Sequence, residues 1–160
     1  MGLLPRRQRI AVVEMFGMIG GSIKSPTYEQ IFSRIQKDRR TRAMVLDIDS
    51  PGGSVPVSDY LYRSVGKVAA EKPVVANVRG LGASGAYLIG CAAHKIVAIP
   101  GSLVGSIGVI SIRPVLEELL DRLGIGVNVN KSGALKDMGA FWRQATDEEK
   151  QKTQELIDGF

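Results

Sequence analysis

Residues 43–53 of the chain are AMVLDIDSPGG, and this stretch decides the fold class. Ala43 to Ile48 is a nearly continuous apolar run, which is typical of a strand buried on both faces of a parallel sheet. The segment Asp49–Gly53 that follows ends in consecutive glycines and predicts a tight turn. A buried strand that leads into a glycine turn is characteristic of an α/β fold.

Strand and helix patterns alternate outward from this stretch. We expect extended segments at 9–15, 73–78, 95–99, 104–112 and 125–130. We expect helices at 27–38, 57–71, 84–93 and 114–124, and from 146 to the chain end. Capping boxes mark the start of the first and the last helix, Thr27 with Gln30 and Thr146 with Glu149. Repeated strand–helix units with buried strands predict a mainly parallel sheet.

Length and composition predict one globular domain. The chain has 160 residues, of which 44% are hydrophobic, enough to build a core from Val, Ile, Leu and Ala. We therefore expect an N-terminal tail at 1–8 and a single domain at 9–160. The last residues bring no evident closing element, so we expect this domain to be truncated at its C-terminus.

Composition excludes several classes of site and partner. Cys91 and His94 are the sole cysteine and histidine, so we expect no disulfide within the chain and no metal site. The net charge is +5, but no aromatic residues accompany the basic clusters, one of which contains Arg6 and Arg7, to stack on nucleic-acid bases. A basic face near anionic lipid fits better. No apolar run approaches the ~20 residues of a membrane span, so we expect any membrane anchor to lie outside this sequence.

Ser84 is the candidate nucleophile. It lies between a predicted strand and a predicted helix, within the small residues Gly80–Ala86. Glycines permit a strained turn and a close approach of substrate, and a helix start offers free N–H groups to an oxyanion. The N–H of Gly53, at a second strand end, would complete an oxyanion hole with that of Gly85. The alternative is that Ser84 only caps a buried helix.

A serine nucleophile needs a base, and lysine is the residue type that fits. His94 lies at the far end of the helix that Ser84 begins, about 15 Å away, which is too far for its imidazole. We expect His94 to lie at a helix C-terminus, where the helix dipole favours a positive charge. Lys136 and Lys131 are the candidate bases, and either must be uncharged to act. From the residues alone, both could equally be ordinary surface lysines.

Four short motifs give the chain a resemblance to a known family. They are DSPGG at 49–53, GASGAY at 82–87, GSIGV at 105–109 and KSGxxKD at 131–137. Their order and spacing resemble those of the signal peptide peptidase A family, the serine peptidases of family S49. The resemblance runs from about Ile10 to the chain end. It implies an α/β fold of the crotonase/ClpP-like kind, a spiral of ββα units with mainly parallel sheets.

The resemblance also implies roles for individual residues. Ser84 matches the family's nucleophile, Lys136 its general base, and Ser106 a serine that orients the lysine. Gly53 and Gly85 match the oxyanion-hole positions. The function implied is a serine endopeptidase with a Ser–Lys dyad that cleaves remnant signal peptides or similar apolar peptides. The family works at the membrane as a homo-oligomer and needs no cofactor.

Other functions stay open at this point. Crotonase-type acyl-CoA chemistry would use the same paired N–H groups, with Asp137 or Glu117 as its carboxylate. A non-catalytic member of the fold would bind peptides in the same cleft, and a histidine base would have to come from another chain. Gly80, Gly82 and Gly85 match a dinucleotide-binding turn, but no acidic residue lies from 73 to 116 to hold a ribose.

Overall fold

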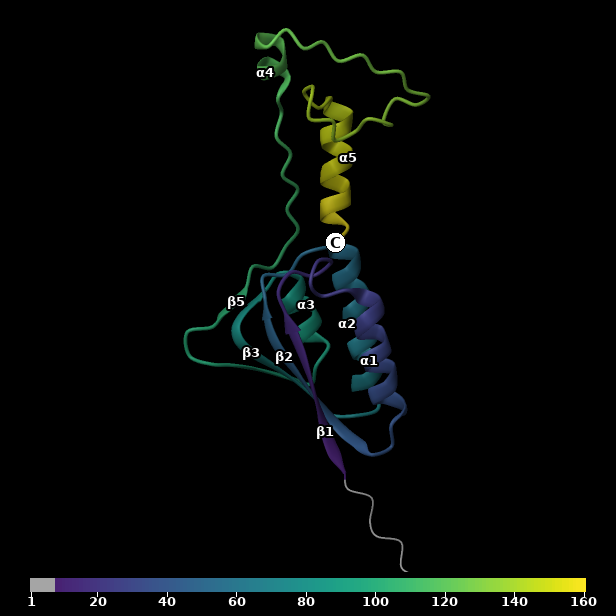
Figure 1. Cartoon of the computed structure of the whole chain (residues 1–160), viewed down its shortest axis with the longest axis vertical. Helices are drawn as coiled ribbons and strands as arrows, with labels where there is room; N and C mark the ends of the chain where they lie inside the picture. The colour runs from purple at the N-terminus through teal and green to yellow at the C-terminus, as the bar shows by residue number, and fades with distance from the viewer. Residues whose placement is uncertain (1–7) are drawn as a thin grey trace, which may run out of the picture. The chain divides into compact units, whose positions relative to one another are not determined.

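The structure is a computed structural model that describes residues 8–160 (Figure 1). The chain divides into two compact units, of which the first ends at Ile107 and the second spans Gly108–Phe160. Arg6, Arg7 and most of the predicted N-terminal tail lie outside the described residues. The single truncated domain over 9–160 stays a prediction.

The first unit is a parallel β-sheet with helices packed against it. The strand order is β1-β2-β3-β4, each neighbouring pair is parallel, and β5 pairs with the second half of β3. The predicted α/β class with a mainly parallel sheet is therefore confirmed. In chain order the elements are β1 (Arg9–Phe16), α1 (Ser25–Lys37), β2 (Thr41–Ser50), α2 (Val55–Ala69), β3 (Val74–Ala83), α3 (Gly85–Cys91), β4 (Lys95–Ala98) and β5 (Leu103–Gly105).

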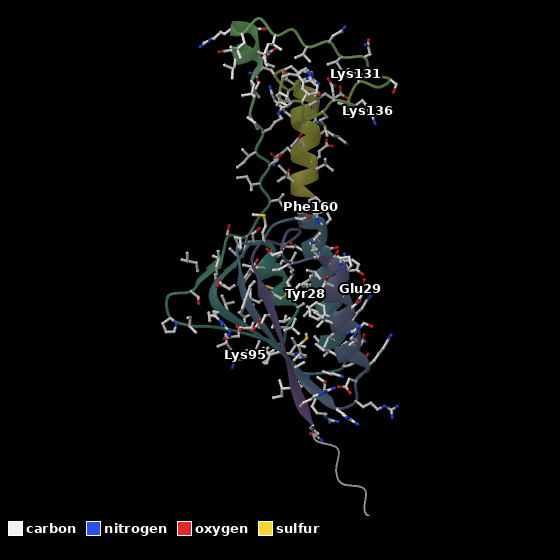
Figure 2. The ribbon with its side chains drawn as sticks, viewed as in Figure 1. Tyr28, Glu29, Lys95, Lys131, Lys136 and Phe160 are labelled. Carbon is white, nitrogen blue, oxygen red and sulfur yellow. The ribbon has the colours of Figure 1, made fainter. Side chains whose placement is uncertain are left out.

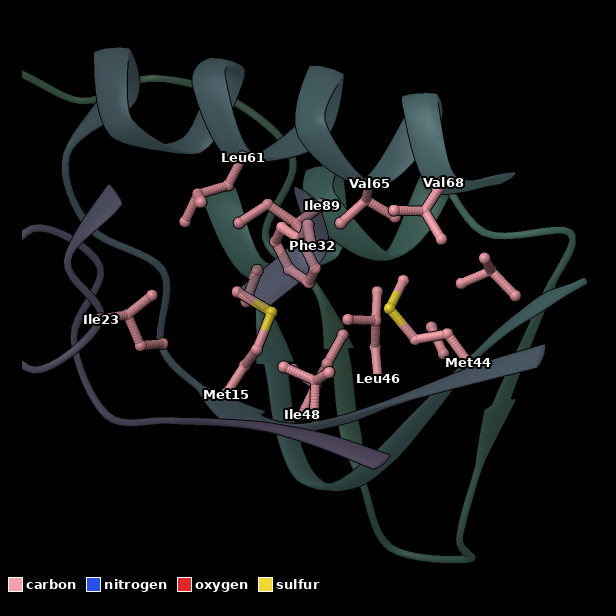
Figure 3. Close-up of a cluster of buried hydrophobic side chains, with 14 of the residues drawn as sticks. Met15, Ile23, Phe32, Met44, Leu46, Ile48, Leu61, Val65, Val68 and Ile89 are labelled. Atoms are coloured by element: carbon pink, nitrogen blue, oxygen red, sulfur yellow. The ribbon is translucent and has the colours of Figure 1, made fainter. Parts of the chain in front are cut away.

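The hydrophobic core of this unit lies between one face of the sheet and α1, α2 and α3 (Figure 3). Alternate residues of β2 point into it and are at most 1% exposed: Met44, Leu46 and Ile48. A one-residue slip of β2 would turn these side chains to the opposite face, so their burial fixes the register of the sheet. The helices contribute Phe32, Leu61, Val65, Val68 and Ile89.

The other face of the sheet is more open than the apolar run of β2 suggested. Val45 is half-buried, and its neighbour Val12 on β1 is 62% exposed. Asp47 is buried on this face, because Asn77 Nδ2 donates to its carboxylate at 2.9 Å and Arg79 forms an ion pair with it. The prediction of a strand buried on both faces is thus correct for the helix-covered face and only partly correct for the other.

Two element boundaries in this unit differ from the prediction. α1 begins at Ser25, so Thr27 lies inside its first turn and the predicted capping box with Gln30 does not form. Pro26 occupies that first turn, where its missing N–H costs no helical hydrogen bond. β3 continues through Ala83, so the small residues that suggested a turn belong to the strand and carry it up to the candidate nucleophile.

The second unit contains α4 (Glu117–Arg122) and α5 (Asp147–Asp158), with irregular segments around them. The capping box predicted for α5 is confirmed: Glu149 N–H donates to Thr146 Oγ1 at 3.2 Å, and Thr146 N–H donates to the Glu149 carboxylate at 2.8 Å. Among residues 8–160, no helix combines the length and the apolar character needed to cross a membrane.

The strand predicted at 125–130 is wrong for this structure, because the segment has no regular secondary structure. Its alternating pattern is real, but the apolar side chains of Ile125, Val127 and Val129 are at least 40% exposed. A strand forms only against a partner backbone, and no described residue pairs with this segment. The long extended segment predicted at 104–112 is likewise reduced to β5.

Candidate active site

Ser84 lies at the junction of β3 and α3, where its backbone is strained. Its φ is 53° and its ψ is −123°, and Ser106 is the only other non-glycine among residues 8–160 with a positive φ. Such a conformation costs about 1–3 kcal/mol and is kept mostly at functional sites. Ser84 N–H donates to Gly105 O at 2.8 Å, which ties the strained residue to the end of β5.

The hydroxyl of Ser84 does not cap the helix. Ser84 occupies the N-cap position of α3, yet its side chain forms no capping hydrogen bond. Its Oγ has no other hydrogen-bond partner within the described part of the chain, and the residue is partly exposed. Ser84 therefore holds the N-cap position, as the alternative interpretation expected, but its side chain does not supply the capping hydrogen bond. A sharp strand-to-helix turn that presents a free hydroxyl is the geometry of a nucleophile.

The Gly52–Gly53 turn lies directly against Ser84. A Cβ atom on Gly52 would come within 2.9 Å of both Ser84 Cβ and Gly85 N. Gly52 has a φ of +91°, and its N–H donates to the Oγ of the buried Ser50 at 3.1 Å. The end of β2 and the end of β3 therefore meet with no side chain between them.

Gly53 and Gly85 each present a free backbone N–H. Ile19 and Gly53 form an isolated parallel β-bridge, whose hydrogen bonds are made by the two residues on either side of Gly53. Ile19 N–H donates to Gly52 O at 2.8 Å, and Ser54 N–H donates to Ile19 O at 2.9 Å. The Gly53 amide therefore points away from Ile19. Gly85 is the first residue of α3, so its N–H has no partner within the helix. Neither amide has an acceptor among residues 8–160.

Ser106 lies next to Ser84 because of the pairing between β3 and β5. Ala83 pairs with Gly105 in parallel register, and Ser84 and Ser106 directly follow the ends of these two strands. Ser106 is exposed and has a φ of 52°. The structure thus brings together Ser84, Ser106 and the two glycine amides within the first unit.

Lys131 and Lys136 lie in one loop of the second unit (Figure 2) and differ in their partners. Lys131 Nζ donates to Asp137 Oδ1 at 2.6 Å and to Ala134 O at 2.9 Å. Lys136 is exposed, and within residues 8–160 its Nζ has no hydrogen-bond or ion-pair partner. Lys131 is thus engaged by Asp137 and a backbone carbonyl, whereas Lys136 is engaged by neither.

An ion-pair network that the sequence did not reveal anchors this loop. Arg143 Nε donates to Asp137 Oδ2 at 3.1 Å, and its other nitrogens donate to both oxygens of Glu149 at 2.8 and 2.5 Å. Hydrogen bonds from Arg143 and then Lys131 hold the pKa of Asp137 well below its usual range. The Arg143 guanidinium and the Thr146 amide lower the pKa of Glu149 to about 2. In the sequence, only the capping box predicted for Thr146 and Glu149 indicated part of this network.

His94 is a structural residue. Its Nδ1 accepts the Val74 N–H at 3.1 Å, and its own N–H donates to Val74 O at 2.9 Å. α3 ends at Cys91, so His94 lies shortly after the C-terminal end of that helix. Val74 begins β3 whereas Ser84 follows its end, so His94 is remote from the nucleophile.

Comparison with known proteins decides the family. The family model described as Peptidase family S49 matches residues 67–160, which is more than half of the chain. The chain belongs to peptidase family S49. The matched region includes both Ser84 and Lys136.

Two relatives of this S49 chain carry protease names. It is 41% identical, over 82% of its length, to "Putative protease MJ0651" of Methanocaldococcus jannaschii. It is 33% identical, over 93% of its length, to "Serine protease SPPA, chloroplastic" of Arabidopsis thaliana. The chain spans 42% and 24% of the lengths of these two relatives.

A solved structure agrees with the fold. A variant of 1510-N, a membrane-bound stomatin-specific protease in complex with a substrate peptide, matches with a TM-score of 0.51 and 25% sequence identity. The match covers 69% of this chain and 48% of that one. The α/β fold class with a mainly parallel sheet that the sequence predicted is confirmed for this S49 chain.

The carboxylates that acyl-CoA chemistry would need are already engaged in this S49 chain. Asp137 is bound by Lys131 and Arg143, as described above. Glu117 Oε2 accepts the Gln144 N–H at 3.1 Å. Asp137 is therefore held in ion pairs, and one oxygen of Glu117 is occupied by a backbone amide.

Proposed function

We propose that this chain carries the catalytic groups of a serine endopeptidase, with Ser84 as nucleophile and Lys136 as general base. The observation that carries the proposal is the free hydroxyl of Ser84 on a strained turn, beside the unpaired amides of Gly53 and Gly85. Membership of peptidase family S49 supports it independently.

The proposed reaction is acyl transfer from a peptide to water. Uncharged Lys136 takes the proton of Ser84 Oγ, and the alkoxide attacks the carbonyl carbon of the substrate. The amides of Gly53 and Gly85 donate to the oxygen on which negative charge develops. Lys136 then returns its proton to the leaving amine, and water hydrolyses the acyl-enzyme.

Ser106 is proposed to orient the base. It stands beside Ser84 at the end of the adjacent strand, and its hydroxyl has no partner in the described part of the chain. A hydroxyl at this place can accept a hydrogen bond from the Lys136 amine and aim it at Ser84 Oγ. The approach of Lys136 to both serines is part of this proposal.

Apolar peptides are the proposed substrates. Leu88 lies one helical turn after Ser84 and is 39% exposed, and Leu103 and Val104 of β5 are 70% and 42% exposed. These side chains can contact an extended apolar segment such as a remnant signal peptide. The membrane-bound state of 1510-N supports the further proposal that this chain acts at a membrane surface. Assembly into a homo-oligomer is proposed with it.

A fluorogenic peptide with an apolar core tests this function in the wild type and the Ser84→Ala variant. We expect the wild type to cleave the peptide and the variant to lose at least about a thousandfold in kcat, because the nucleophile is gone. Ser33→Ala, in α1, is the matched control and should retain full activity.

The alternatives give different outcomes in the same assay. Turnover of an acyl-CoA thioester by Ser84→Ala would overturn the peptidase proposal in favour of crotonase chemistry. Binding of the peptide by a folded wild type that never cleaves it would indicate a non-catalytic member of the fold.

A further inference from the structure

The strand that leads to Ser84 contains a bulge that the proposed mechanism leaves unexplained. β2 and β3 pair Ile48 with Val78 and then Ser50 with Gly82. Asp49 on β2 therefore lies opposite the whole segment Arg79–Leu81 on β3, which we call the bulge. Bulges of this kind bend a strand, and they are frequent beside active sites.

The bulge is the place where β3 changes its partner. Before it, Val75–Val78 pair with Lys95–Ala98 of β4. From the last residue of the bulge onward, Leu81–Ala83 pair with Leu103–Gly105 of β5. Because Ser84 directly follows Ala83, the path that β3 takes after the bulge places Ser84 beside the end of β5.

Asp49 holds the bulge through its side chain. Its Oδ1 accepts the Leu81 N–H at 3.0 Å, a hydrogen bond made stronger by the negative charge of the acceptor. A Cβ atom on Gly80 would lie 3.1 Å from the same oxygen, so the glycine allows the carboxylate to approach the backbone this closely. Arg79 adds a second anchor, since it pairs with Asp47 and lies 5.1 Å from the centre of the Phe16 ring.

Adjacent residues of β2 thus hold the two backbone segments that form the oxyanion hole. Asp49 holds the strand that carries Ser84 and Gly85, and the buried Ser50 holds the Gly52 amide before Gly53. Side chains of successive strand residues point to opposite faces, so Asp49 acts on one side of the sheet and Ser50 acts on the other.

We propose that Asp49 is a positioning residue for the reaction at Ser84. By accepting the Leu81 amide hydrogen, it fixes the bulge and thereby the places of Ser84 Oγ and the Gly85 N–H. It does not touch the substrate. This inference rests on the proposed peptidase function.

The labelling rate of Ser84 by a fluorophosphonate, together with kcat and KM for the apolar peptide, tests the inference. Asp49→Ala removes the acceptor, and we expect labelling and kcat to fall about ten- to a hundredfold with little change in KM. Asp49→Asn keeps an oxygen acceptor and should stay within about fivefold of the wild type. Asp49 is exposed, so neither variant leaves a cavity. Glu14→Ala, an exposed carboxylate on the same face of β1, should change nothing.

Hydrogen exchange of the segment 79–85 provides a readout that does not depend on activity. We expect faster exchange at the Leu81 amide in Asp49→Ala than in Asp49→Asn, with residues 44–48 unchanged. Labelling of Asp49→Ala at the wild-type rate would overturn this inference alone. A loss of labelling in Asp49→Asn as large as that in Asp49→Ala would also overturn it. A folded wild type that the reagent leaves unlabelled would overturn the peptidase function and the positioning role with it.

Discussion

Ser84 combines a strained backbone with a hydroxyl that no described residue binds. A serine kept for the fold alone would cap α3 and adopt an ordinary backbone conformation. The strained backbone lowers the stability of the folded chain, so it is explained by a requirement other than folding. At the scale of single residues, the strain at Ser84 is therefore the strongest sign of chemistry in this structure.

Gly53→Ala should unfold the turn that presents the proposed oxyanion donor. The new Cβ atom would lie 2.2 Å from the backbone oxygen of Ile19, at a φ of +148°. We expect a loss of about 2–4 kcal/mol in the free energy of unfolding, measured by urea denaturation, and no peptidase activity. Gly66→Ala, in α2 with open space around it, should instead stabilise by about 1 kcal/mol. A Gly53→Ala variant as stable as the wild type would contradict the packing described for this turn.

Shortening a side chain on the core side of β2 should lower the stability of the fold far more than shortening one on the outer face of the sheet. Leu46 is fully buried, and Leu46→Ala should lower the free energy of unfolding by about 3 kcal/mol through lost contacts and a cavity. Val12→Ala on β1, whose side chain is 62% exposed, should cost less than about 1 kcal/mol. Chemical denaturation measures both, and similar losses would show that the outer face is covered in solution.

The stability of the start of α5 should depend on pH because of Glu149. Its pKa is about 2 in the folded chain and 4.5 ordinarily, so protonation favours the unfolded state. This contribution to stability is complete above about pH 5 and is lost as the pH falls towards 2. Circular dichroism should show helix loss over this range in the wild type and a weaker pH dependence in Glu149→Gln. Asp59→Asn, an exposed carboxylate in α2, should behave as the wild type.

The sequence predicted strands and helices well where the residues that bury them also lie in the first unit. The apolar run at 43–48 was placed correctly as a strand because the helices that cover it lie within the same unit. The segment 125–130 has an equally clear alternating pattern, but no described backbone pairs with it, so periodicity alone gave the wrong element. Thr27 failed as a cap because the proline at 26 allows the helix to begin earlier.

The candidate site was predictable to the extent that its residues lie in local motifs. The motifs at 49–53 and 82–87 identified Ser84, Gly53 and Gly85, and the sheet brings these together. The bulge opposite Asp49 and the network around Arg143 depend on pairing across the fold, which no spacing in the chain encodes. Their roles therefore became visible only in the structure.

At the scale of the whole molecule, the proposed catalytic pair is divided between the two units. The connecting segment that begins at Ile107 has no regular secondary structure up to Leu116, and Ile107, Ile110 and Ile112 are 79–81% exposed. Thermolysin should therefore cut first within 106–116, as followed by mass spectrometry, and cleavage should abolish peptide hydrolysis. First cuts inside β1–α3 would contradict this order of accessibility.

The most direct test of the Ser–Lys assignment is the mass of the chain after treatment with a fluorophosphonate, compared among wild type, Lys136→Met and Lys131→Met. We predict one adduct at Ser84 in the wild type and in Lys131→Met, and a rate at least about a hundredfold lower in Lys136→Met. Labelling of Lys136→Met at the wild-type rate would contradict the assignment of the base. An adduct at any residue other than Ser84 would contradict the assignment of the nucleophile.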